Sequence, residues 1–283
     1  MKDFLALTKP RVVLMVLVTT AAGFHVGSGQ AAGWLRLLQT LIGTGLAAAG
    51  TIALNQYLER DLDARMERTR RRPLPQGRIQ PLEGLAFGVA ITAGGILYLT
   101  FAVSPLGALL AALTAGIYLF AYTPLKQTSP LSTIVGAIPG GLPPMIGYAA
   151  ARGGLGLRAW ILFAILFLWQ IPHALAIARL YRDDYARAGI RFLPVVDPDG
   201  RRTGVPVVSH CLALLIVGLL PTLIGLAGPF YFFGALAFGA AFLACGVHLA
   251  IARSAPAARR LLLASIVYLP AVLALMALDK LPS

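Results

Sequence analysis

Oxygen-bearing side chains recur at helical spacing where a long apolar run meets a charged segment. Asn55, Glu59 and Asp63 follow one another at intervals of four residues. On one continuous helix, side chains four residues apart differ in direction about the helix axis by only about 40°, so the three lie along one stripe. Acids stacked in this way repel unless a cation neutralises them, and oxygen ligands without His or Cys favour Mg²⁺. The motif predicts a Mg²⁺ site suited to a phosphorylated substrate. The alternative is a solvated helix end whose acids pair with nearby arginines.

Arginines crowd the segment that comes next. Seven lie between Arg60 and Arg78. One guanidinium group can bind two phosphate oxygens at once, and it stays charged at any pH a protein meets. Acids that hold a metal next to arginines that hold phosphate therefore predict a diphosphate-binding site. The alternative is that the cluster sets the membrane topology and contacts anionic lipid.

A second polar segment begins inside a later apolar run. His173 lies within that run, where an ionisable residue is a functional candidate by default; the alternative is a packing contact with a neighbouring helix. Asp184 follows eleven residues later, within about 20° of the same face if the helix continues. If the helix continued that far, a polar stripe would join His173 to Asp184, although we expect the span itself to end near residue 178.

A third segment is rich in glycine and proline. Pro124, Lys126 and Gln127 precede an apolar run that contains Gly136, residues 139–141, Pro143 and Pro144. Glycine lets helices approach closely, and proline frees backbone carbonyls, which a membrane protein tolerates beside a cavity. We expect a kinked helix at a cavity here, although packing alone explains the pattern equally well.

The elements that must position these residues are membrane helices. The chain is 58% hydrophobic and 12% charged, with a mean hydropathy of +0.78, whereas a soluble domain carries about 25% charged residues. We predict an all-α, polytopic bundle in which residues 1–283 form a single intramembrane domain. The nine expected helices span about 12–28, 37–57, 85–103, 106–122, 132–150, 158–178, 205–225, 230–252 and 260–278.

The charge pattern predicts the orientation. With the N-terminus inside and the C-terminus outside, only Arg36, Arg152, Arg158 and Lys280 of the 24 basic residues lie on the outer side. The candidate site then faces the cytoplasm at the inner membrane. The basic residues fall in short segments between apolar runs, so the net charge of +13 does not indicate nucleic-acid binding. The basic start followed by residues 12–24 has the outline of a signal peptide, but we expect an uncleaved first span.

Several stretches together resemble the UbiA superfamily of intramembrane prenyltransferases, in particular its heme-farnesylating branch. They include residues 55–74, Tyr122 to Lys126 and Trp169 to His173. The resemblance implies a nine-helix α bundle that transfers farnesyl from farnesyl diphosphate to a vinyl group of heme B, with Mg²⁺ as cofactor, to give heme O. Implied partners are the lipid bilayer, a heme A synthase and oxidase assembly proteins.

The resemblance also assigns roles to individual residues. Asn55, Glu59 and Asp63 match the first acidic motif, and Asp184 matches the second, in which Ala188 stands where a companion Asp is common. The residues expected to act in catalysis or to hold metal are Asn55, Glu59, Asp63, Asp183 and Asp184. Those expected to bind substrate are Lys9, Arg11, Arg68, Arg72, Lys126, His173, Tyr181 and Arg182.

Two other functions remain open at this point. The same Mg²⁺ chemistry would serve a UbiA-type enzyme that acts on a quinone or lipid precursor. A transporter would need broken helices in inverted halves and ionisable groups near the midplane, and the sequence shows no convincing repeat of this kind.

Overall fold

The computed structural model describes residues 1–28 and 33–281 and is helical. Within these ranges, nine helical segments are long and apolar enough to cross a membrane, each within a few residues of its predicted position. They are α2 (Pro10–Gly27), α3 (Trp34–Leu58), α5 (Pro81–Ala102), the segment Pro105–Thr128, the segment Ser132–Arg152, α10 (Leu157–Leu180), α13 (Arg201–Leu223), α14 (Pro229–Ala252) and α15 (Ala255–Leu278). The prediction of an all-α membrane bundle is confirmed.

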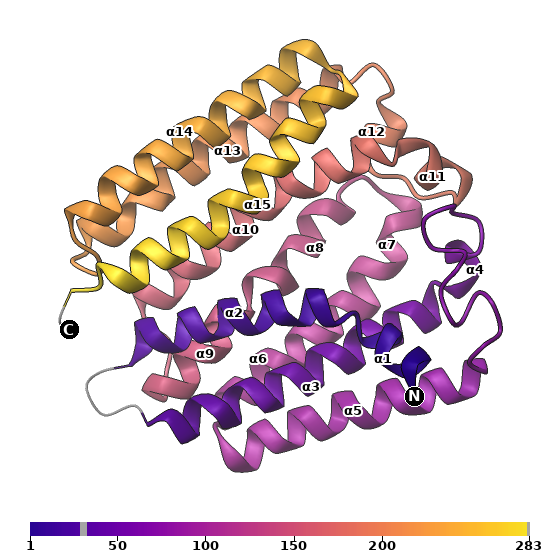
Figure 1. Ribbon diagram of the computed structural model, residues 1–283, viewed down its shortest axis with the longest axis horizontal. Helices are drawn as coiled ribbons and strands as arrows, with labels where there is room; N and C mark the ends of the chain where they lie inside the picture. Colours follow the sequence, from indigo (N-terminus) through magenta and orange to yellow (C-terminus); the bar gives the residue numbers. More distant parts are fainter. Residues whose placement is uncertain (29–32, 282–283) are drawn as a thin grey trace.

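Four short helices gather at one end of the bundle (Figure 1). They are α1 (Lys2–Thr8), α4 (Arg60–Asp63), α11 (Arg182–Arg187) and α12 (Leu193–Val196). The N-terminus lies at this end and α15 ends at the other, as an odd number of spans requires. We call the end that carries α1, α4, α11 and α12 the polar end, because the charged segments that follow the second and sixth spans, roughly residues 58–84 and 179–204, lie there.

Helix α10 packs between two parts of the bundle. Helices α13 and α15 lie against α10 on one side and α8 (Ser132–Gly141) lies on the other, while α2 packs on α9 (Pro143–Arg152) and α3 packs on α5. The crossing of α2 and α9 is close because it is built on glycine: a Cβ on Gly23 would fall 1.9 Å from the Pro144 carbonyl oxygen. A Cβ on Gly147 would fall equally close to the Thr20 carbonyl oxygen.

Two spans are broken beside the cavity described below. The fifth span divides at Leu142 into α8 and α9, because Pro143 and Pro144 lack the N–H groups that would continue α8. The fourth span contains α6 (Pro105–Gly116), a π-helical segment η1 (Ile117–Tyr122) and α7 (Thr123–Thr128). The kinked helix expected from the third segment is therefore present, and its residues Gly136 and Pro139 line the cavity.

The helix that carries His173 ends near its expected position and does not continue to Asp184. Helix α10 ends at Leu180, Tyr181 leaves helical geometry with φ −108° and ψ 27°, and α11 starts a new direction at Arg182. The two side chains consequently have different surroundings, because helical phase relates two residues only while the helix continues. His173 lines the cavity, whereas Asp184 contacts a loop at the polar end.

We expect the glycine contacts at the crossing of α2 and α9 to limit stability. Replacing Gly23 or Gly147 with Ala forces a methyl group into backbone atoms, so each change should cost about 1–3 kcal/mol or more. Gly94→Ala in α5 is the matched control, since a Cβ there meets no atom within 4 Å. The control should keep or slightly raise the melting temperature of the detergent-solubilised protein, since Ala is the better helix former. Equal melting temperatures for the three variants would show that the crossing has room for a methyl group and would contradict the prediction.

Candidate functional site

The first acidic motif keeps its spacing although its helix ends. Helix α3 stops at Leu58, and Glu59 links it to α4 with φ −97° and ψ 7°. The Glu59 amide still donates to the Asn55 carbonyl (2.9 Å) and the Asp63 amide to the Glu59 carbonyl (2.8 Å), so the four-residue rise is preserved. All three side chains are buried, and Asp63 is only 1% exposed.

Each side chain of this motif has one polar partner from another part of the site. Asn55 Nδ2 donates to Thr123 Oγ1 (3.0 Å), Lys126 Nζ donates to Glu59 Oε1 (2.6 Å), and the Arg72 guanidinium donates to Asp63 Oδ2 (2.6 Å). The amide oxygen of Asn55 and the second carboxylate oxygens, Oε2 of Glu59 and Oδ1 of Asp63, accept no hydrogen bond from the described residues. Three hard oxygen atoms are thus left available, which is the donor chemistry that Mg²⁺ prefers.

Asp184 forms hydrogen bonds to the backbone of the arginine-rich loop. Its two carboxylate oxygens accept the backbone N–H groups of Glu67 and Arg68, both at 3.3 Å, and Arg187 also donates to it. The same loop returns to Asp63, whose carbonyl accepts the Thr69 hydroxyl at 2.9 Å. The loop of residues 64–72 therefore connects the two acidic motifs.

Aromatic rings orient two of the cations. The Arg68 guanidinium lies 5.2 Å from the ring centre of Tyr181 and 5.7 Å from that of Tyr185, and it donates to the Tyr185 hydroxyl at 3.2 Å. Lys126 Nζ lies 4.3 Å from the ring centre of Tyr122. These cation–π contacts restrain both charged groups without neutralising them; Arg68 thus keeps its charge for an anion, while Lys126 is paired with Glu59.

Two predicted residues lie apart from this group. Asp183 is 78% exposed on its side chain and pairs with Arg182 at 3.1 Å, while Arg182 also reaches the Pro198 carbonyl at 3.5 Å. Neighbouring residues on a helix point about 100° apart, so the burial of Asp184 turns Asp183 outward. Among the described residues no three His, Cys, Asp or Glu side chains are close enough to hold one ion, and Asp184 is therefore not assembled with Glu59 and Asp63.

Lys9 is the linker residue between α1 and α2 at the polar end, and its backbone is strained. It links α1 to α2 with φ 45° and ψ 70°, in the left-handed region that a residue with a Cβ rarely adopts. Burial and the positive charge of Arg72 lower the pKa of Lys9 to about 8, partly against the effect of Asp63. Burial likewise raises the pKa of Asp63, with Arg72 opposing that change. Lys9 therefore interacts electrostatically with Asp63 and Glu59 of the acidic motif and with their partner Arg72.

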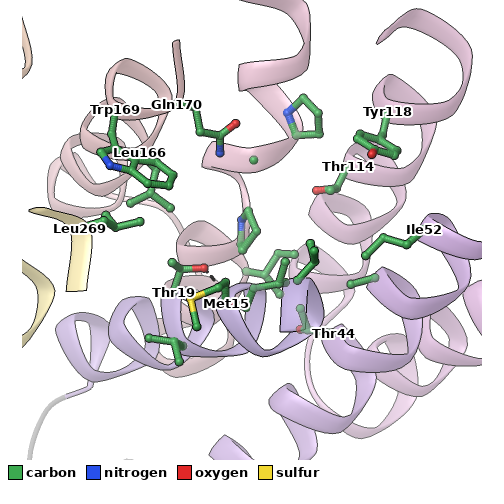
Figure 2. A pocket seen from close by; sticks show the side chains of 18 of the residues that line it. Met15, Thr19, Thr44, Ile52, Thr114, Tyr118, Leu166, Trp169, Gln170 and Leu269 are labelled. Atoms are coloured by element: carbon green, nitrogen blue, oxygen red, sulfur yellow. Dashed lines mark hydrogen bonds between the residues drawn. The ribbon is translucent and has the colours of Figure 1, made fainter. Parts of the chain in front are cut away.

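A cavity of about 570 Å³ lies inside the bundle, and its lining reaches to within one helical turn of the acidic motif at Thr51. Figure 2 shows Trp169 and Gln170 of α10 on one side, Tyr118 and Thr114 on the other, and Met15 and Thr19 of α2 below. Most of the lining is apolar, and its volume lies in the range of small-molecule pockets, roughly 300–1,000 Å³. Thr51, one helical turn before Asn55, lines the cavity, and so does the exposed Arg11. The apolar cavity therefore begins beside the oxygen-rich site.

The site also contains residues that sequence patterns did not single out. Tyr118 lines the cavity and lies beside Tyr122, with ring centres 5.2 Å apart. The four-residue spacing of Tyr118 and Tyr122 could have indicated, from the sequence alone, that the two rings lie on one helix face. Ser265 of α15 bonds to His173 across the bundle (2.7 Å), and no local pattern in the sequence marks it.

Comparisons with known proteins agree with this geometry. A protoheme IX farnesyltransferase from Solibacter usitatus is 50% identical over 99% of both chains. A protoheme IX farnesyltransferase from Koribacter versatilis is 43% identical over 99% of this chain and 94% of its own. Both relatives therefore match across the whole set of spans and loops.

Solved structures share the fold at low sequence identity. One of digeranylgeranylglyceryl phosphate synthase has a TM-score of 0.83 at 16% identity and covers 98% of this chain and 97% of its own. A UbiA homolog from Archaeoglobus fulgidus bound to GPP and Mg²⁺ has a TM-score of 0.69 at 15% identity and covers 97% of this chain and 99% of its own. The UbiA prenyltransferase family profile matches residues 16–269, and the chain belongs to that family of prenyltransferases.

Proposed function

We propose that this prenyltransferase transfers farnesyl from farnesyl diphosphate to a vinyl group of heme B, giving heme O. The observation that carries the proposal is the junction of a buried, oxygen-rich and cationic site with an apolar cavity. A prenyl diphosphate has the same division, with a charged head and an apolar tail. Heme as the acceptor is supported by the full-length relatives named protoheme IX farnesyltransferase. Membership in the family also favours an enzyme over a transporter.

The first motif is our proposed metal site. Asn55, Glu59 and Asp63 would hold Mg²⁺ through the oxygens that the described residues leave unpaired, and the bound ion would neutralise charge on the departing diphosphate. The homolog from Archaeoglobus fulgidus bound to GPP and Mg²⁺ supports this assignment. Asp184 is also proposed to act here: its Oδ2 accepts the Arg68 amide and keeps a second lone pair, so it can accept this bond and a metal ion together.

The cations of the polar end would bind the diphosphate. Lys9, Arg72 and Lys126 lie beside the motif from different parts of the chain, and Arg68, which Tyr181 orients, lies on the same loop as Arg72. As the C–O bond of the substrate breaks, diphosphate leaves with the electron pair and these groups stabilise its charge. The vinyl carbon then forms the new C–C bond, and water adds to the adjacent carbon with loss of a proton. The apolar lining keeps water from reaching the prenyl cation earlier.

We further propose that the polar end faces the cytoplasm at the inner membrane. This orientation places most Lys and Arg residues inside and leaves only Arg36, Arg152, Arg158 and Lys280 outside. A substrate with a diphosphate group would then enter from the aqueous phase while its tail enters the bundle. Arg182 and Asp183, paired with each other near the surface, are left out of the proposed binding set.

The acceptor can be tested directly. Membranes that contain the protein are incubated with labelled farnesyl diphosphate and either heme B or 4-hydroxybenzoate, with and without Mg²⁺. We expect the label in a heme product only, and only with Mg²⁺. Labelled 4-hydroxybenzoate would instead identify an enzyme of quinone synthesis, and diphosphate release that needs no Mg²⁺ would contradict the metal site.

Asp63 and Asp61 form a matched pair for testing the acidic motif. Both lie on α4, but the Asp63 side chain is 1% exposed and that of Asp61 is 79% exposed. We expect Asp63→Asn to lower farnesyl transfer by at least about 100-fold, because a charged ligand near the leaving group is lost. Asp61→Asn should change it less than twofold. Similar activity of the two variants in folded protein would remove Asp63 from the metal site.

The buried pair of Lys126 and Glu59 predicts a metal-dependent stability. Lys126→Met leaves Glu59 without its cation, which typically costs about 3–5 kcal/mol for a buried pair. If Glu59 also binds Mg²⁺, millimolar Mg²⁺ should recover part of the lost melting temperature in Lys126→Met. The double variant Lys126→Met with Glu59→Gln should lack both the loss and the recovery. Recovery by Mg²⁺ in the double variant as well would exclude Glu59 as the ligand.

A further inference from the structure

A single residue of α15 holds two cavity-lining side chains of α10. The Trp169 Nε1–H group donates to the Ser265 carbonyl at 2.8 Å, and His173 Nδ1 lies 2.7 Å from Ser265 Oγ. The Trp169 and His173 rings stack on each other, with centres 4.8 Å apart and planes 23° apart. Ser265 is fully buried, so neither contact competes with water. The imidazole is therefore held on one edge and one face.

The hydrogen bonds around Ser265 determine which imidazole nitrogen carries the proton. A hydroxyl group has one hydrogen to donate, and that of Ser265 is donated to the Leu262 carbonyl at 2.6 Å. Ser265 Oγ must therefore accept the bond from His173, which places the proton on Nδ1. The neutral ring then has its lone pair on Nε2, and none of the described residues makes a hydrogen bond to that atom.

The surroundings of His173 indicate what this lone pair can meet. His173 lines the cavity together with Trp169 and Gln170 of its own helix and with Ile266, Leu269 and Pro270 of α15. Because Nδ1 is turned to α15, Nε2 is the ring atom left for a molecule inside the cavity. A farnesyl chain offers it nothing, since a hydrocarbon accepts no electron pair. An iron porphyrin does, because a neutral imidazole nitrogen whose other nitrogen is held by a hydrogen bond is a common metal ligand.

We propose that Ser265 is a positioning residue that fixes the tautomer of His173, so that His173 Nε2 coordinates the iron of the heme substrate in the cavity. This inference rests on the proposed function, since it requires a heme acceptor. Coordination would hold the porphyrin by its centre and so set the distance from the vinyl group to the oxygen-rich site. Ser265 touches no reacting atom and acts only through His173 and Trp169.

The test measures binding of iron protoporphyrin IX and of metal-free protoporphyrin IX to the purified full-length protein in detergent. We expect the wild type to bind the iron form more tightly and to give the absorption spectrum of an imidazole-ligated heme. His173→Ala should lose that spectrum and the preference for iron. Ser265→Ala should weaken iron binding by about 10-fold or more while the metal-free form binds as before, as expected when a partner of a metal ligand is lost.

Two further variants separate positioning from folding. Ser265→Thr keeps the hydroxyl and should retain the imidazole-ligated spectrum. Ser209→Ala removes an exposed serine of α13 that also bonds to a carbonyl three residues earlier, and it should match the wild type. Melting temperatures report whether each variant is folded, and a spectrum lost equally in Ser265→Ala and Ser265→Thr would overturn the role of the hydroxyl.

The outcomes distinguish this inference from the proposed function. Equal affinity for iron and metal-free porphyrin, without an imidazole-ligated spectrum in the wild type, would overturn iron coordination and leave heme farnesylation intact. Failure to bind either porphyrin would overturn the proposed acceptor itself. A loss of farnesyl transfer in Ser265→Ala that appears in kcat with an unchanged KM for farnesyl diphosphate would support the positioning role.

Discussion

Charged groups inside a membrane bundle need partners, and the polar end of this protein is organised by that requirement. Removing one member of a buried ion pair costs several kcal/mol, because the remaining charge has no water to replace its partner. The pairs of Glu59 with Lys126 and Asp63 with Arg72 join the end of α3 and α4 to the fourth span and to the arginine-rich loop. Asn55 adds a third connection through Thr123. These few contacts fix the positions of Lys126 and Arg72 beside the acidic motif.

The same contacts allow the site to change its charge balance. The partners of Glu59 and Asp63 are themselves cations that a diphosphate can bind. In the proposed function, a divalent cation on the free carboxylate oxygens would share the negative charge of Glu59 and Asp63 and so leave Lys126 and Arg72 more available to phosphate oxygens. Asp184 has a different part in this arrangement, because it binds the backbone of the loop that carries Arg68. The loop of residues 64–72 thus links the first acidic motif, through Asp63, to Asp184.

Broken helices provide the cavity beside this charged site. The π-helical segment η1 shifts Tyr118 and Tyr122 relative to a regular α-helix, and the prolines that follow Leu142 open the fifth span. Such interruptions expose backbone groups that lipid cannot satisfy, so they are found where protein or a cavity covers them. The apolar lining and the oxygen-rich site therefore lie together because the same spans, the second and the fourth, contribute to both.

The sequence alone determined the features that depend on local periodicity and composition. Long apolar runs predicted nine spans whose bounds differ from the structure by a few residues, since a helix must bury its length in lipid whatever its neighbours are. The four-residue spacing of Asn55, Glu59 and Asp63 persisted, because backbone hydrogen bonds continue through Glu59. The glycine and proline pattern also predicted a kinked helix at a cavity. A stripe from His173 to Asp184 depended on the helix continuing, and α10 ends at Leu180, before it reaches Asp184.

Only the tertiary structure decided which of these residues meet. The pairing of Glu59 with Lys126 joins residues 67 positions apart, and that of His173 with Ser265 joins residues 92 positions apart. Helix phase carries no information about such partners, since they depend on which helices pack together and at what depth. Adjacent acids differ for the same reason: Asp184 is buried against a loop while Asp183 lies at the surface. Periodicity is a property of one segment, whereas a site is a property of the packing between segments.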